Sequence, residues 1–122
     1  MKFHLQTASA SLVTGSGPGW IRIGPDEYRE NVILLPDQVV RGWAPAGFDA
    51  LTASDFEGLL EYRPDIVLLG TGVRQRFPHP RLLAALTTAG VGVETMDTRA
   101  ACRTFNILIA EERRVVAALE VE

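Results

Sequence analysis

The chain has 122 residues, of which 47% are hydrophobic and 22% charged, and a formal net charge of −3. This size and composition are typical of one globular domain with its own core, so residues 1–122 are predicted to form a single domain. The negative net charge argues against a protein that binds nucleic acid over an extended face.

The compartment is predicted from cysteine content and from the absence of apolar targeting segments. Cys102 is the single cysteine, which excludes an internal disulfide and disfavours a cysteine-based zinc site. Residues 1–6 lack the apolar core of a signal peptide, and no apolar segment approaches the roughly 18 residues that cross a bilayer. We therefore expect a cytoplasmic protein with no membrane span and no bound metal.

The first segment, residues 1–19, is predicted to be a mobile arm or open loop. Residues 7–19 are small, polar and glycine-rich, and offer little apolar surface to offset the entropy of ordering. The end of the segment, Gly15-Ser16-Gly17-Pro18-Gly19, resembles a phosphate-binding loop only superficially, because neither a Lys-Ser/Thr pair nor a helix follows it.

An antiparallel meander of three short strands is predicted next, at residues 20–23, 31–35 and 39–43. The first run alternates apolar and polar residues, and turn residues separate the runs. Trp20 and Trp43, near strand ends, are interpreted as core or rim residues of this scaffold rather than as the lining of a pocket.

From residue 52 onward the pattern changes to alternating helices and strands. Thr52 and Asp55 have the spacing of a capping box at a helix start. The apolar run at residues 65–69 is typical of a strand buried on both faces. Pro80 is placed to open the second helix. The remaining elements are predicted to be a parallel strand at residues 91–95, a third helix at residues 98–110 and a last strand at residues 115–121.

These elements predict an α/β fold. We expect a compact three-layer domain in which an N-terminal antiparallel β-meander is followed by βαβαβ, with a mixed, partly parallel sheet.

Gly70, Thr71 and Gly72 follow the buried strand at the edge where parallel sheets bind ligands. They do not complete a dinucleotide fingerprint, since Gln75 stands where the third glycine would be, and no cofactor is predicted. The alternative is structural: the glycines allow a sharp turn of positive φ or the close approach of another segment.

The start of the third helix, near Thr98, is predicted to lie at the same edge. A small anion would find there the helix N-terminus and the guanidinium groups of Arg99 and Arg103, one turn apart. In the alternative interpretation, Asp97 caps the helix and pairs with one of these arginines. Residues 74–103 contain five arginines and two acidic residues, and the binding prediction includes Arg74 and Arg76 of this segment.

Catalytic candidates are few. Cys102 could act as a nucleophile if the helix start lowered its pKa, with His79 as base and Asp97 as orienter. The alternative is that Cys102 is a small core residue. Because no catalytic motif is complete, we expect that the protein is not an enzyme.

The runs at residues 68–72, 76–77 and 90–106 resemble the small single-domain family that includes mitochondrial complex I assembly factor three. The segment from Met96 to Asn106, with its Met-Asp-Thr-x-x-Ala-x-Arg-Thr-Phe-Asn pattern, is the most specific part of this resemblance. The resemblance implies a three-layer α/β fold of mixed sheets with helices. In eukaryotic members it implies non-catalytic help in assembling the NADH dehydrogenase with a partner assembly factor, and it offers no catalytic residues.

Three functions remain open from the sequence. The first is a non-enzymatic binding or assembly protein whose protein partner contacts the turn from Arg74 to Phe77. The second is a small-molecule or anion site, with or without enzymatic activity, at Gly70–Gly72 and the helix start near Thr98. The third is an RNA contact through the five-arginine segment, which the net charge of the chain disfavours.

Overall fold

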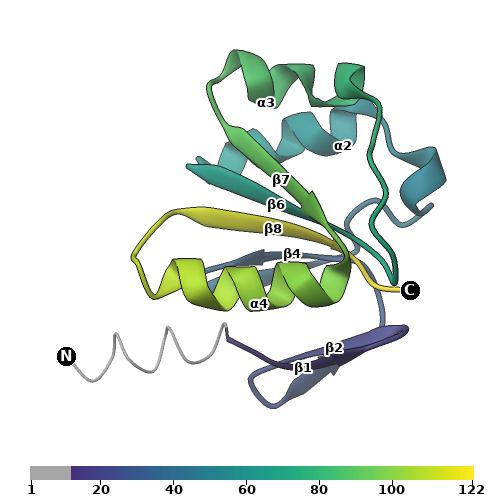
Figure 1. Cartoon of the computed structure of the whole chain (residues 1–122), viewed down its shortest axis with the longest axis vertical. Coiled ribbons are helices and arrows are strands. Elements are labelled where there is room, and N and C mark those ends of the chain that lie inside the picture. Colours follow the sequence, from purple (N-terminus) through teal and green to yellow (C-terminus); the bar gives the residue numbers. More distant parts are fainter. Residues whose placement is uncertain (1–11) are drawn as a thin grey trace.

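The computed structural model describes residues 12–122 and contains two β-sheets (Figure 1). Sheet A is antiparallel, with strands in the order β1-β2-β3, and sheet B has five strands in the order β5-β4-β8-β6-β7. The strands are β1 (Val13–Gly17), β2 (Trp20–Ile23), β3 (Asp26–Tyr28), β4 (Val32–Leu35), β5 (Gln38–Arg41), β6 (Ile66–Thr71), β7 (Gly92–Met96) and β8 (Val115–Glu120).

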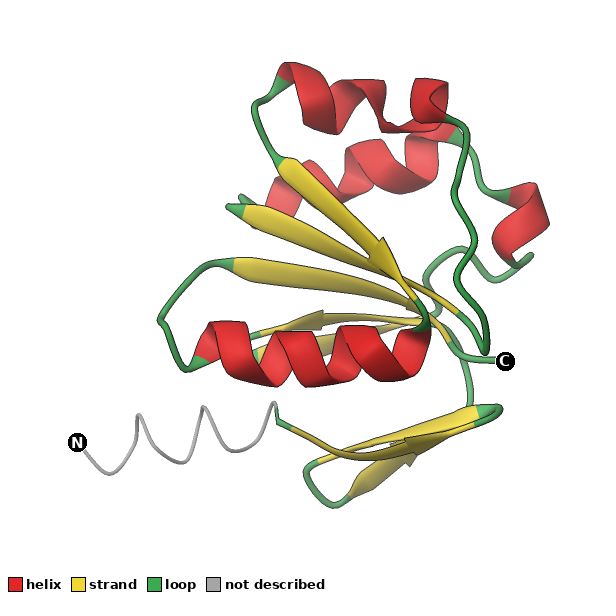
Figure 2. Cartoon of the chain, in the orientation of Figure 1, coloured by secondary structure: helices red, strands yellow, loops and turns green. Residues whose placement is uncertain are grey.

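Helices and sheet A cover the two faces of sheet B, so the fold has three layers (Figure 2). Helix α4 (Thr98–Ile109) and sheet A lie on one face. Helices α2 (Ala53–Glu57) and α3 (Ala84–Thr88) lie on the other face. Short 3-10 segments are η1 (Phe48–Ala50), η2 (Gly58–Tyr62) and η3 (Pro80–Leu83). The predicted three-layer α/β fold is confirmed.

Strand β6 is buried on both faces, as its apolar run predicts. Leu68 packs in the core beneath α4, while its neighbour Leu69 packs in the core beneath α2 and α3, and both are fully buried. The strand pairs in parallel with β7 on one side and β8 on the other. The predicted parallel pairing of residues 65–69 with residues 91–95 is therefore confirmed.

The predicted antiparallel pairing of residues 31–35 with residues 39–43 is confirmed, but the predicted place of the first strand, residues 20–23, is wrong. Strand β2 pairs with β1 and β3, whereas β4 and β5 form a hairpin at the edge of sheet B. The difference follows from burial: β2 alternates half-buried and buried residues, while all four residues of β4 are buried. An unbroken apolar run belongs inside a covered sheet, and an alternating run belongs on a sheet with one exposed face.

The predicted arm is wrong for residues 13–17, which form β1. Trp20 supplies the apolar surface that this segment lacks, because its indole lies against the backbone of β1. A Cβ atom on Gly17 would come within 2.6 Å of the indole nitrogen, and one on Gly15 within 3.4 Å of the ring. The absence of side chains at Gly15 and Gly17 therefore leaves room for the indole ring. The rest of the predicted arm, residues 1–11, lies outside the described residues.

The predicted helix starts agree with the structure. The Thr52 side chain accepts a hydrogen bond from the Asp55 N–H at 3.4 Å, and the Asp55 carboxylate accepts one from the Thr52 N–H at 2.8 Å. Pro80 opens η3, which continues into α3. Helix α4 begins at Thr98, as predicted.

Candidate functional site

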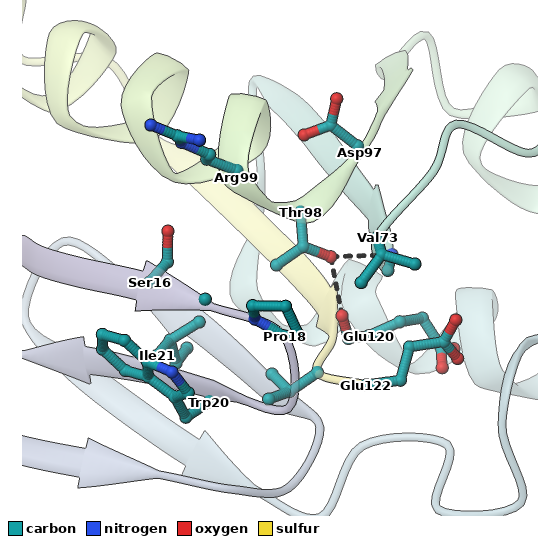
Figure 3. Close-up of a pocket in the computed structure, with 13 residues that line it drawn as sticks. Ser16, Pro18, Trp20, Ile21, Val73, Asp97, Thr98, Arg99, Glu120 and Glu122 are labelled. Carbon is teal, nitrogen blue, oxygen red and sulfur yellow. Dashed lines mark hydrogen bonds between the residues drawn. The ribbon is translucent and has the colours of Figure 1, made fainter.

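Strands β6, β7 and β8 end at the edge of sheet B where α4 begins, and Thr98 links them (Figure 3). The Thr98 N–H donates to the Gly72 carbonyl at 2.9 Å, and the Gly72 N–H donates to Thr98 Oγ1 at 2.8 Å. The same hydroxyl donates to the Glu120 carbonyl at 2.6 Å. The structure therefore brings together the glycine turn and the helix start that the sequence analysis places at one edge.

The two glycines allow this close packing. A Cβ atom on Gly70 would lie 2.9 Å from the Leu119 side chain and 3.1 Å from the Thr98 Cα atom. Gly72 has a φ of +93°, and a Cβ atom there would lie 2.5 Å from the Glu122 carboxylate. Both glycines thus have the structural role that the sequence analysis leaves open as an alternative.

Most of the backbone donors in the first turn of α4 already have partners. Asp97 caps the helix, since its carboxylate accepts the Ala100 N–H at 2.8 Å. The Thr98 N–H is taken by Gly72, and the Ala101 N–H by the Asp97 carbonyl. Within residues 12–122, Asp97 forms no ion pair with Arg99 or Arg103. The predicted cap by Asp97 is therefore confirmed, and the predicted ion pair of Asp97 with Arg99 or Arg103 is wrong.

An open cavity of about 440 Å³ lies between the β1–β2 hairpin and the start of α4 (Figure 3). Of the predicted binding residues, Gly72, Asp97, Thr98 and Arg99 line it, together with Trp20 and other hairpin residues. The predicted residues that do not line it are Gly70, Thr71, Arg74, Arg76 and Arg103. The residues of the β1–β2 hairpin that line the cavity are not among the predicted binding residues, because the composition of residues 15–19 is typical of a loop.

A second cavity, of about 310 Å³, lies between β1 and α4. Arg99 and Ser16 line both cavities, while Arg103 and Asn106 line only this one. The two predicted arginines on α4 therefore share a cavity, but Arg103 is not at the glycine turn.

Arg76 has a structural role in the turn that follows β6. Its guanidinium donates to the Thr71 carbonyl at 2.6 Å, pairs with the Glu122 carboxylate at 2.8 Å and lies 4.4 Å from the centre of the Phe48 ring. The Thr71 hydroxyl donates to the Arg74 carbonyl and accepts the Arg76 N–H. Thr71 and Arg76 hold the turn in place, whereas the Arg74 side chain is exposed.

The environment of Cys102 opposes a catalytic role. The thiol is buried, and this burial raises its pKa to about 12, so the lowered pKa expected of a nucleophile is wrong. His79 Nδ1 accepts the Arg81 N–H at 3.0 Å and caps η3. Asp97 caps α4. Each of the three proposed catalytic residues thus has another structural explanation.

Glu120, which the sequence analysis did not single out, is buried beside this edge with only 1% of its surface exposed. One carboxylate oxygen accepts a hydrogen bond from Asn31 Nδ2 at 3.0 Å, and Oε2 has no partner among residues 12–122. Burial raises the pKa of this carboxyl to about 7. In the sequence, Glu120 could have been recognised as unusual because it is a glutamate in the otherwise apolar run that forms β8.

Two further findings concern metals and membranes. Within residues 12–122, no three His, Cys, Asp or Glu side chains gather in a way that could hold a metal ion. In that same part of the chain, no helix has both the length and the apolarity needed to cross a membrane.

Comparisons with known proteins give a family and related structures. The model of a family described as protein of unknown function (DUF498/DUF598) matches residues 13–120. NADH dehydrogenase (ubiquinone) 1 alpha subcomplex assembly factor 3 of Mus musculus is 40% identical over 89 residues, which are 71% of this chain and 48% of that protein. An uncharacterised protein of Rhodobacter capsulatus is 35% identical over 112 residues, which are 92% of this chain and 86% of that protein.

Similarity extends to a solved structure. A crystal structure of a Bordetella parapertussis protein has a TM-score of 0.86 and 37% identity, and the match covers 93% of this chain and 98% of that one. By contrast, the chain spans about half the length of the mouse assembly factor that it matches.

Proposed function

Because the chain belongs to the DUF498/DUF598 family of proteins of unknown function, and its relatives include a named assembly factor, we propose that it is a non-enzymatic binding or assembly protein. The family membership confirms the resemblance that residues 68–106 indicate. The proposed activity is to hold a protein partner, and the proposed location is the cytoplasm, where a single reduced thiol is compatible with the redox conditions.

The observation that carries this proposal is a fixed turn that exposes apolar side chains. Val73 is 63% exposed and Phe77 is 73% exposed. The backbone between them is held by the Thr71 hydroxyl and by Arg76, and the Gln75 side chain donates to the Thr95 carbonyl at 2.8 Å. A turn that is ordered before binding loses little entropy on association, so exposed apolar groups on it are suited to a partner.

The test is capture of partner proteins from a lysate of the source cells. We expect the double variant Val73→Ser with Phe77→Ser to lose at least about 90% of the captured partner, because truncating exposed interface anchors removes most of the binding energy. Ile107→Ser is the matched control, since Ile107 is 62% exposed on α4. Identical capture by the wild type and both variants would contradict the proposal.

A second candidate function, binding of a small anion, rests on the cavity of about 440 Å³ and on Arg99 in its wall. Arg99 forms no ion pair within residues 12–122, so its guanidinium is available to a carboxylate or phosphate. Titration with inorganic phosphate and with acetate, followed by amide chemical shifts, tests this function. Shifts confined to the cavity residues and abolished in Arg99→Gln support it, and the absence of any shift contradicts it.

A further inference from the structure

The second cavity, between strand β1 and helix α4, is an open groove, which we call the β1–α4 groove. It is lined by Val13, Thr14, Gly15, Ser16, Arg99, Cys102, Arg103 and Asn106. We propose that an extended acidic segment of the partner protein binds in this groove and pairs with the edge of β1 that faces away from β2, which no other strand of residues 12–122 occupies. This proposal rests on the proposed binding function and names the chemistry of the partner.

The free backbone groups of β1 follow from its register with β2. The hairpin turn has two residues between Gly17 and Trp20, so this flanking pair exchanges backbone hydrogen bonds. The next pair, Ser16 and Ile21, is then a non-hydrogen-bonded pair. Because β1 is an edge strand of sheet A, the Ser16 N–H and carbonyl point away from β2, toward the groove. An extended peptide could therefore pair there.

Farther along the same edge, a side chain already makes the bonds that a peptide would make. Asn106 Oδ1 accepts the Val13 N–H at 3.0 Å, and Asn106 Nδ2 donates to the Val13 carbonyl at 2.9 Å. An amide group thus occupies one pairing position of this edge. Within residues 12–122, the outward groups of Ser16 have no such partner.

Two arginines give the groove its charge. Arg99 and Arg103 are exposed, lie one turn apart on α4 and form no ion pair within residues 12–122. The nearby carboxylate of Asp97 is engaged by the Ala100 N–H. Two unpaired guanidinium groups beside a free strand edge are complementary to carboxylate side chains on an extended peptide.

The groove continues into the larger cavity, since Ser16 and Arg99 line both. Apolar side chains of Pro18, Trp20 and Val73 contribute to the lining of that cavity (Figure 3). The complementary partner segment therefore has acidic residues opposite α4, followed by an aromatic or aliphatic residue beside the hairpin. Val73 also belongs to the exposed turn of the proposed function, so the groove and the turn can form one continuous interface.

The experiment measures fluorescence anisotropy of a labelled short peptide with alternating aspartate and valine residues and a terminal phenylalanine, added to the full chain. We expect Arg99→Glu with Arg103→Glu to weaken binding at least about tenfold, because two charge-assisted contacts are lost. Arg81→Glu with Arg113→Glu makes the same charge change elsewhere on the surface, and should change affinity less than about twofold. Thermal unfolding of each variant checks that the fold is retained.

Two substitutions at one position test the strand pairing itself. Ser16→Pro removes an N–H that points away from β2, so the hydrogen bonds between β1 and β2 keep their donors, and proline is tolerated at such a position of an edge strand. We expect it to bind the peptide about tenfold more weakly than Ser16→Ala, which keeps that N–H. Equal binding by both variants overturns strand pairing and with it the proposal.

Further peptide-binding results would also overturn the proposed binding of an acidic segment. Equal binding of a peptide with lysine in place of aspartate overturns the proposal. So does full displacement of the peptide by inorganic phosphate at equal concentration, which would favour a small-anion site. Binding that requires removal of residues 1–11 also overturns the proposal, because it would assign the groove to the chain's own N-terminal segment. If lysate capture depends on Val73 and Phe77 but not on Arg99 and Arg103, the groove proposal fails while the proposed binding function stands.

Discussion

Glu120 is the residue whose ionisation state bears most on the stability of the fold. Its carboxyl is almost fully buried, and its pKa is about 7 compared with an ordinary value of 4.5. Burial is the main cause of this rise, and Glu122 and Asp55 add to it, while Asn31 and Arg76 oppose it. The folded protein therefore favours the protonated carboxyl, although Asn31 donates a hydrogen bond to it.

The contribution of Glu120 to the stability of the fold should consequently fall as the pH rises. The contribution of Glu120 is fully present below about pH 4.5, is lost progressively as the carboxyl ionises in the unfolded chain, and is gone above about pH 7. The total change is about 3 kcal/mol. We expect Glu120→Gln to remove this dependence in urea unfolding at about pH 5 and about pH 8. Glu94→Gln, at an exposed position, should keep the wild-type dependence.

Cys102 should be chemically inert in the native protein. Its burial and raised pKa leave almost no thiolate at about pH 8, and the thiolate is the species that reacts. We expect a thiol-specific reagent to modify Cys102 only after denaturation. The variant Ile107→Cys, which adds an exposed thiol to the same helix, should react at once with one equivalent of reagent. Rapid modification of Cys102 in the native protein would contradict this account.

At the scale of elements, the strands and helices that interact with their sequence neighbours were predictable. The run at residues 65–69 and the caps at Thr52 and Asp97 are local patterns, and each appears in the structure. Strand β1 was not predictable from a local pattern, because its ordered conformation depends on the packing of Trp20 over Gly15 and Gly17. The pairing of β4 with β8 joins segments about 85 residues apart, and no local pattern records such a contact.

The attachment of α4 to β6 should depend on the missing side chain at Gly70. In Gly70→Ala, the new methyl group would meet the backbone of Thr98 at 3.1 Å and the Leu119 side chain at 2.9 Å. We expect a loss of about 1–3 kcal/mol in the free energy of unfolding, the usual range for overpacking a tight interface. Gly92→Ala, in the neighbouring strand, meets nothing within 4 Å and should change stability little.

At the scale of the whole molecule, sheet A, sheet B and α4 meet in one shared core. Ile21 and Ile23 of sheet A share a core with Phe105 of α4, and the Asn106 side chain holds the backbone of Val13. Sheet A is thus attached to a helix that itself packs on sheet B. The candidate site lies where these parts meet, so the sequence could indicate only the sheet B half of it.

We expect Asn106→Ala to loosen sheet A without unfolding sheet B. The variant leaves the Val13 N–H and carbonyl without their partner, so amide hydrogens of β1 and β2 should exchange faster while those of β6 and β8 stay protected. Hydrogen exchange followed by mass spectrometry measures this difference. Ile107→Ala, one residue along the helix at an exposed position, serves as the control. Equal acceleration in both sheets would show that they open as one unit.

Strand β8 has a central place in sheet B, between β4 and β6, although it is the last of the five strands along the sequence. During synthesis on the ribosome, the β4–β5 hairpin and the β6–β7 pair therefore emerge before the strand that joins them. Until β8 emerges, each half carries an unpaired apolar edge that could associate with other chains. Closure of sheet B thus has to wait until β8 has emerged, and nascent chains stalled before residue 115 should be prone to aggregation.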